Sequence, residues 1–167
     1  MSFSIYRASV PVFLHAFHAL HLIIEKAEAS AQTRNIDLAV FFNARLAPDM
    51  LPFSAQVQIA SDTAKAAGAR LAGVDIPSWP DDEKTFDDLK ARIAKTVAFL
   101  EGLDEAKFAG AEDRKVTQKV RGNEVEFSGA DYLMKRQIPN FFFHITTAYD
   151  ILRHNGVDIG KRDYLAL

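Results

Sequence analysis

The chain has 167 residues, of which 49% are apolar and 25% charged, so it can bury a sizeable core and has the composition of a soluble globular protein. Its net charge of -2 argues against a nucleic-acid partner, and the absence of cysteine excludes disulfides, thiolate metal sites and cysteine nucleophiles. The chain begins with no signal-peptide pattern and contains no run of about 18 apolar residues, so we expect one domain over residues 1–167 in the cytoplasm, with no membrane partner.

The first amphipathic pattern predicts a helix over residues 5–32, in which Pro11 either kinks the helix or marks its start. Histidines recur at three-residue spacing in this segment, and histidines so spaced on a helix can reach one metal ion. Because no carboxylate has matching spacing, we expect them to flank the core and contact solvent or backbone. The core face is Phe13, Phe17, Leu20 and Ile24, and the histidines are His15, His18 and His21.

A short helix over residues 38–46 ends at an Ala-Pro-Asp break, and a long helix follows from residues 51–52 to residue 67 or beyond. The long helix carries an apolar stripe in which alanines allow a neighbouring helix to approach closely. A second, polar stripe on the same helix is expected to be a solvated face. The apolar stripe is Phe53, Val57, Ala60, Ala64 and Ala67, and the polar stripe is Ser54, Gln58, Asp62 and Lys65.

The third long helix is predicted over residues 86–100. Thr85 and Asp88 have the spacing of a capping box at its start. The loop before it contains the lone tryptophan, Trp79, which we expect to anchor the loop to the helices. A regular seam of three- and four-residue spacings runs along this helix, through Phe86, Leu89, Ile93, Val97 and Leu100.

The hydrophobic period changes from helix to strand over residues 116–127, which predicts a β-hairpin. A Gly122-Asn123 loop would place Val120 opposite Val125. Such a small hairpin is unstable alone and must pack on the helices. Ser128 can then cap a helix that leads into the last one.

The last helix is predicted over residues 138–156, with Pro139 in its first turn and Gly156 just past its end. It is apolar almost all round, so we expect it inside a bundle. Its polar residues share one stripe and need partners if they are buried, which makes this stripe the best functional indication: Asn140, His144 and Thr147. The sequence therefore predicts an all-α fold, a four-helix bundle with a small hairpin before the last helix.

The chain resembles, over nearly its whole length, a family of uncharacterised bacterial proteins within the DinB/YfiT-like metalloenzyme superfamily. The resemblance lies in four segments, namely residues 45–50, 56–58, 139–156 and 160–163. It implies a DinB-like four-helix bundle that forms a homodimer and acts on a small molecule. Many members of the superfamily hold nickel or zinc with one histidine on the second helix and two histidines four residues apart on the fourth.

Carried over by position, this resemblance places Gln58, Asn140 and His144 at the three metal-ligand positions. Two of the three therefore depart from histidine. One imidazole with two amides is a poor transition-metal site, because amide oxygens suit calcium-like ions. Asp62, one turn after Gln58, could add a carboxylate. We expect no native metal, with a divalent nickel or zinc ion as the alternative.

Two functions follow from these residues. In the first, the protein is a DinB-like enzyme, transferase- or hydrolase-like, in which His144 is a metal ligand or general base. Gln58, Asn140 and Asp62 would then bind substrate or water, and Tyr149 could donate a hydrogen bond. In the second, Gln58, Asn140 and His144 form a polar network inside a non-catalytic dimeric bundle that binds a small molecule or only dimerises. The basic residues Lys115, Lys119 and Arg121 lack an aromatic platform, so nucleic-acid binding is the weakest interpretation.

Overall fold

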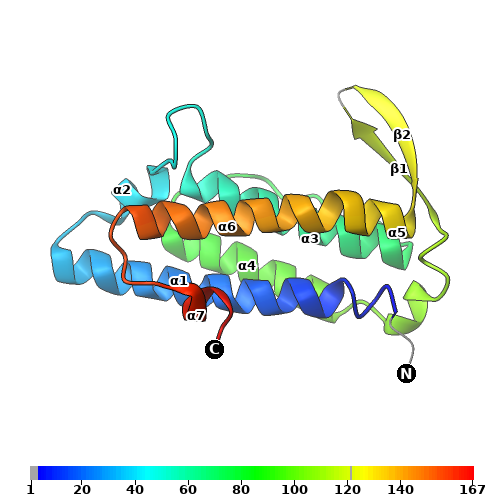
Figure 1. The fold of residues 1–167 in the computed structure, drawn as a ribbon, viewed down its shortest axis with the longest axis horizontal. Coiled ribbons are helices and arrows are strands. Elements are labelled where there is room, and N and C mark those ends of the chain that lie inside the picture. The colour runs from blue at the N-terminus through cyan, green and yellow to red at the C-terminus, as the bar shows by residue number, and fades with distance from the viewer. Residues whose placement is uncertain (1–3, 121) are drawn as a thin grey trace.

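The computed structural model describes residues 4–120 and 122–167 and shows a four-helix bundle (Figure 1). The four long helices are α1 (Val10–Arg34), α3 (Phe53–Ala72), α4 (Phe86–Glu101) and α6 (Ile138–His154). Each packs against the next in a ring, α1 on α4, α4 on α3, α3 on α6 and α6 on α1. No helix in the described ranges is both long enough and apolar enough to cross a membrane. The expected all-α, DinB-like class with a small hairpin is confirmed.

The shorter elements connect these helices and cover the ends of the bundle. Pro11 marks the start of α1 and does not kink it, because a proline in the first turn removes no helical hydrogen bond. The predicted capping box of Thr85 and Asp88 is present. The remaining elements are α2 (Leu38–Asn43), η1 (Glu105–Phe108), β1 (Lys115–Val120), β2 (Asn123–Ser128), α5 (Gly129–Tyr132), η2 (Leu133–Gln137) and α7 (Lys161–Tyr164).

The core contains the apolar stripes that the sequence predicts. The α1 stripe and the α3 stripe are fully or almost fully buried. Between α1 and α6 the Phe141 ring meets Phe13 and Phe17 edge to face, with ring centroids 4.8 Å and 5.3 Å apart. Gly68 lies where α3 approaches α4, and a Cβ there would be 2.8 Å from the side chains of Leu100 and Leu103. Small residues on α3 therefore set its close approach to its neighbours.

The last helix is continuous with α5 through η2, a π-helical segment. This segment ends at Gln137, two residues before Pro139, whose missing N–H removes one i→i−4 hydrogen bond and favours a locally rearranged turn. Helix α6 packs against α3 and α1, but it does not lie wholly inside the bundle as expected, because Phe143 is 55% exposed on its outer face. The polar stripe of α6 lies on its other side, toward α3.

The hairpin stands at one end of the bundle and projects away from it (Figure 1). Its register differs from the predicted one, since Val120 pairs with Asn123 and Gln118 pairs with Val125. The tight turn therefore lies between Val120 and Asn123, and Gly122 supplies the positive φ of 84° that such a turn needs. Arg121 of the predicted basic strand lies outside the described residues. The base of the hairpin packs on the bundle through the buried Val116.

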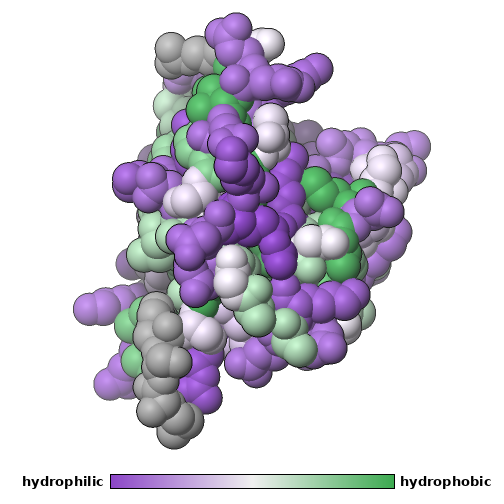
Figure 2. Space-filling model, turned by 90° about the vertical axis from the view of Figure 1, so that its right-hand side faces the viewer, coloured by the Kyte–Doolittle hydropathy of each residue, from purple (hydrophilic) through white to green (hydrophobic). Residues whose placement is uncertain are grey.

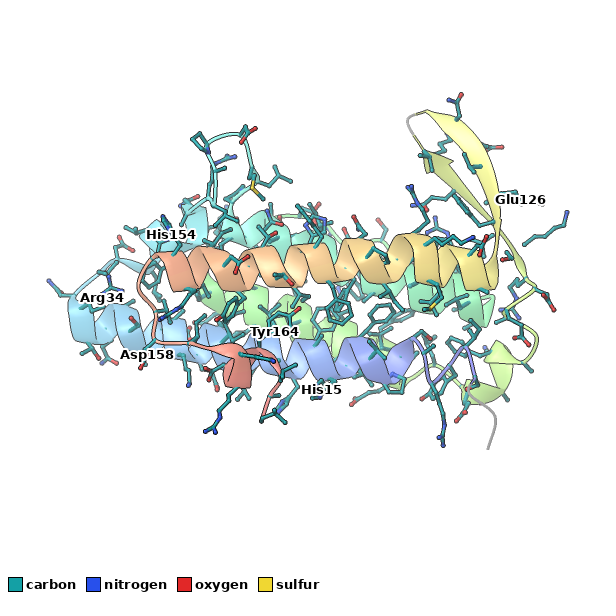
Figure 3. The ribbon with its side chains drawn as sticks, in the orientation of Figure 1. His15, Arg34, Glu126, His154, Asp158 and Tyr164 are labelled. Carbon is teal, nitrogen blue, oxygen red and sulfur yellow. The ribbon has the colours of Figure 1, made fainter. Side chains whose placement is uncertain are left out.

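The C-terminal segment crosses α1 and α6. His15 Nε2 lies 3.0 Å from the carbonyl oxygen of Leu165, and the two hydroxyls of Thr146 and Tyr164 are 2.9 Å apart. Figure 3 shows His15 and Tyr164 close to one another at this crossing. The Tyr149 ring stacks edge-on against Tyr164, with centroids 5.7 Å apart. These contacts hold the tail and give His15 a backbone partner.

Candidate functional site

Helices α3 and α6 run antiparallel, and polar side chains pair across their interface. Thr63 pairs with Asn140 and Gln56 pairs with His144, so residue numbers fall along α6 as they rise along α3. Arg70 lies two further turns along α3, and its guanidinium donates a hydrogen bond to the Tyr132 hydroxyl, a few residues before α6. The α3 partners Gln56, Thr63 and Arg70 recur every seven residues, the spacing that keeps side chains on one helix face.

His144 is buried between these helices with 8% of its surface exposed, and its Nδ1 lies 2.7 Å from Gln56 Oε1. The Gln56 Nε2 donates to the Leu51 carbonyl at 2.9 Å, so its Oε1 must be the acceptor toward the ring. His144 therefore carries its proton on Nδ1 and keeps the lone pair on Nε2. Burial lowers the pKa of His144 below its ordinary value of 6.5, so the ring is neutral at pH 7.

Asn140 is one turn before His144 and lines a pocket of about 420 Å³ between α3, η2, the start of α6 and the middle of β1. Its Nδ2 donates to Thr63 Oγ1 at 2.8 Å. Gln137 Nε2 donates to Gln118 Oε1 at 3.5 Å and so connects the hairpin to the pocket wall. We call this cavity the α3–α6 pocket, and its lining is Asp62, Thr63, Ala66, Arg70, Gln118, Lys135, Arg136, Gln137 and Asn140.

Figure 2 looks onto the end of the molecule that carries the hairpin, and hydrophilic residues gather in the middle of that face. The half-buried Arg70 is held in the pocket wall by Tyr132, because its Nη1 donates to the phenol oxygen at 2.8 Å. The guanidinium also lies 5.6 Å from the centre of the same ring. Burial raises the pKa of Tyr132, so the phenol stays neutral beside this cation.

Gln58 and Asp62 point into a second polar cluster, centred on Arg92 of α4. Gln58 Nε2 donates to Glu83 at 2.8 Å, and Arg92 donates to Glu83 at 2.8 Å and to Asp62 at 3.0 Å. Lys65 pairs with Asp62 at 2.7 Å although its side chain is only 6% exposed. We call Gln58, Asp62, Lys65, Asp81, Glu83 and Arg92 the Arg92 cluster.

The expectation of a solvated polar stripe on α3 is therefore wrong, because the loop before α4 covers it. Trp79 of that loop lies beneath two ammonium groups, with Lys65 Nζ 4.3 Å and Lys95 Nζ 4.6 Å from the ring centre. Burial alone would raise the pKa of Glu83, but hydrogen bonds from Arg92 and Gln58 outweigh it and hold that pKa below its ordinary value. The cluster thus fastens the loop to α3 and α4, as expected for the tryptophan.

The predicted site residues consequently divide between different places. Asn140 and Asp62 line the α3–α6 pocket, His144 lies one turn beyond it, and Gln58 belongs to the Arg92 cluster. Tyr149 contacts the C-terminal segment. Within residues 4–120 and 122–167 no group of three or more His, Cys, Asp or Glu side chains has a metal-binding arrangement. His18 and His21 line a separate groove between α1 and α4, where His21 lies 3.4 Å from Glu25.

Sequence reasoning missed three residues of the interface, Gln56, Thr63 and Arg70. Their seven-residue spacing is visible in the sequence, but alanines and other polar residues between them obscured it. These three residues lie on the same side of α3 as Ala60 and Ala67. Polar residues among the alanines of a packing face are the signal that could have indicated this interface.

The bundle with its small hairpin has the fold of a DinB-like protein. The crystal structure of a DinB family member protein from Shewanella denitrificans is similar, with a TM-score of 0.91 and 43% sequence identity over 96% of this chain and 90% of that one. Residues 5–165 match the family described as Domain of unknown function (DUF1993), and the chain belongs to that family. No curated protein matches this chain.

Proposed function

We propose that this protein binds a small molecule in the α3–α6 pocket and that it does so without a resident transition metal. The observation that carries the proposal is the Asn140–Thr63 hydrogen bond in the wall of a cavity of about 420 Å³. Concave sites with a few convergent polar groups are the usual place for small ligands. The pocket also lies between the two helices to which the resemblance assigns the superfamily's ligand positions.

The donor set of these positions does not fit nickel or zinc. Gln58 is bonded to Glu83, Asn140 to Thr63 and His144 to Gln56, so the three side chains serve three different partners. Only one of the three is an imidazole, and the other two are amides. Transition metals are held in proteins by several imidazole, thiolate or carboxylate ligands. Any chemistry at the pocket is therefore proposed to depend on this chain's polar side chains.

His144 is the proposed general base of such chemistry. Gln56 fixes its tautomer and orientation, as a general base requires, and leaves Nε2 as the proton acceptor. Its lowered pKa keeps that nitrogen unprotonated at neutral pH. It lies one turn from Asn140 on the same helix face, so a ligand that extends from the pocket along α6 would approach it.

The binding proposal is tested with a library of small metabolites, followed by thermal shift and ligand-observed NMR on metal-free protein. A ligand present at about 100 times its dissociation constant stabilises the folded state by about 2.7 kcal/mol. Hits should bind the wild type and lose affinity in Asn140→Leu and Thr63→Val. Thr33→Val is the matched control, because Thr33 is exposed on α1 and bonds only its own helix. Hits that ignore both pocket substitutions, or a library without hits, would overturn the proposal.

A second candidate function, a non-catalytic dimeric bundle, is favoured by the outer surface next to His144. Leu51 and Phe143 are 49% and 55% exposed. Gln56 bonds the Leu51 carbonyl and the His144 ring, and the Phe143 ring lies edge to face with that imidazole, with centroids 5.2 Å apart. Neighbouring exposed apolar side chains are typical of a contact surface. Light scattering after size exclusion tests this, since Phe143→Glu should convert a dimer to a monomer. A wild-type monomer at micromolar concentration would contradict it.

A further inference from the structure

The charges around the α3–α6 pocket are unbalanced. Of the described residues that line it, Arg70, Lys135 and Arg136 carry positive charge and one residue, Asp62, carries negative charge. That carboxylate pairs with two cations of the Arg92 cluster, at 3.0 Å from Arg92 and 2.7 Å from Lys65, and Lys135 pairs with Asp131 at 2.8 Å. Arg70 and Arg136 are therefore the cations of the lining that have no carboxylate partner among the described residues. The pocket therefore presents a positive field to a ligand although the whole chain has a net charge of -2.

Hydrogen-bond donors also exceed acceptors in this pocket. Thr63 accepts from Asn140, and within the described chain its hydroxyl proton has no acceptor. Arg70 donates one N–H to the Tyr132 hydroxyl, and its other guanidinium N–H groups remain available to a ligand. The second Asn140 amide proton is likewise uncommitted among the described residues. A ligand that satisfies these groups must supply acceptor oxygens.

Two of the cations of the pocket lie on a π-helical segment of the backbone. Lys135, Arg136 and Gln137 all belong to the π-helical segment η2, and all three line the cavity. Such turns widen a helix and occur frequently at functional sites. Arg136 lies 5.8 Å from the ring centre of Phe127 on β2, and Arg70 is fixed by the fully buried Tyr132. Two of the three cations are thus positioned by aromatic side chains before a ligand arrives, which reduces the entropy lost on binding.

We infer that the ligand of the α3–α6 pocket is a small oxyanion, a phosphate- or carboxylate-bearing molecule held by Arg70 with Lys135, Arg136, Thr63 and Asn140. The inference rests on the proposed binding function and adds the chemical class. Arg70 forms the central contact, because a guanidinium with free parallel N–H groups matches two oxygens of a phosphate or carboxylate. A cavity of about 420 Å³ is within the usual size of small-molecule sites.

The test measures binding of matched anionic and neutral probes by isothermal titration in a chloride buffer of low ionic strength. The probes are inorganic phosphate, phenyl phosphate and benzoate, with phenol and benzamide as their neutral counterparts. We expect the anions to bind and the neutral probes to bind at least about tenfold more weakly, because a hydrogen bond to a charged group contributes that much. The ratio of phenyl phosphate to benzoate affinity then distinguishes a phosphate site from a carboxylate site.

Three charge-removing variants locate the site. Arg70→Gln should weaken anion binding by about tenfold, whereas the exposed Lys135→Gln and Arg136→Gln should each weaken it by about threefold. Lys161→Gln, which removes an exposed cation from α7 outside the pocket, is the matched control and should leave affinity unchanged. Circular dichroism checks folding, and if Arg70→Gln is misfolded the double variant of Lys135 and Arg136 replaces it.

The outcomes separate this inference from the binding function. Neutral metabolites that bind with Asn140 dependence, together with anions that do not bind, would overturn the oxyanion class and leave the binding function standing. Equal losses in Lys161→Gln and Arg70→Gln would show unspecific attraction and overturn the inference. A pocket that takes no probe and no library compound would overturn both.

Discussion

Helix α3 contributes to two polar regions that differ in how their positive charges are compensated. In the Arg92 cluster, one buried guanidinium is surrounded by the three carboxylates of Asp62, Asp81 and Glu83. In the α3–α6 pocket, Arg70 and Arg136 have no carboxylate partner among the described residues, and the carboxylate of the lining, Asp62, already pairs with Lys65 and Arg92. Asp62 belongs to both regions and marks the boundary between them.

Burial explains the difference. The side chain of Arg92 is 2% exposed, and a charge so far from water must be compensated inside the protein. The cations of the pocket remain partly or largely solvated, so water balances them until a ligand replaces it. The compensated cluster is therefore expected to support the fold, and the uncompensated pocket to bind. Substitutions that disturb one region and spare the other test this contrast.

The largest effect is expected in the Arg92 cluster. Arg92→Met should lower the free energy of unfolding by about 3–5 kcal/mol, because it leaves the nearly buried Glu83 without its counter-charge. Urea denaturation measures the loss. Adding Glu83→Gln should restore part of it, since the stranded charge is then removed.

Lys90→Met is the matched control for Arg92→Met. It removes another α4 cation that pairs with Glu28 and Asp87, but this pair is more exposed and should cost about 1 kcal/mol or less. Anion binding in the pocket should survive Lys90→Met, because neither Lys90 nor its partners line the pocket. Equal losses of stability in the two variants would remove the distinction between the cluster and an ordinary surface ion pair.

A smaller effect is expected at the α3–α6 interface. His144→Ala should lower the free energy of unfolding by about 1–3 kcal/mol, because it strands the buried Oε1 of Gln56. Thermal denaturation measures this, with the exposed His154→Ala on the same helix as control, expected within about 0.5 kcal/mol of wild type. An unchanged melting temperature in His144→Ala would argue that the histidine is held for chemistry alone.

The smallest effect is the contribution of His144 to the pH dependence of the free energy of unfolding. Because burial lowers its pKa in the folded state, the unfolded chain binds the proton first as the pH falls below 6.5. The contribution is therefore complete above that value and is lost progressively below it. Between about pH 7.5 and about pH 5.5 the wild type should lose more stability than His144→Gln. Parallel pH profiles of the two proteins would contradict the assignment.

Local sequence patterns predicted the four long helices. The capping box at Thr85 and the buried stripe through Val57 each depend on neighbours within one or two turns. The predicted start of the first helix at residue 5 was wrong, since α1 begins at Val10, and only the structure shows that Pro11 lies in its first turn. The hairpin register was also wrong, because moving the turn by one position costs little in a sequence that alternates on both sides of Gly122.

The site was predicted only in part. The stripe of Asn140, His144 and Thr147 was found because polar residues stand out on an apolar helix. Their actual partners Gln56 and Thr63 were not, since the facing residues of α3 depend on how two distant helices are rotated against each other. Gln58 was predicted beside Asn140 and His144, but it bonds Glu83 of the loop before α4, 25 residues away in the sequence.

The sequence by itself determined the four helices, the hairpin and the family resemblance, because each depends on local periodicity or on continuous motifs. Only the tertiary structure decided that Gln56 fixes the tautomer of His144, that Arg92 collects three carboxylates, and that Arg70 meets Lys135 and Arg136 around one cavity. These contacts join residues far apart in the chain, so the packing angle and rotation of the helices set them. Those quantities are properties of the assembled core and of no single segment.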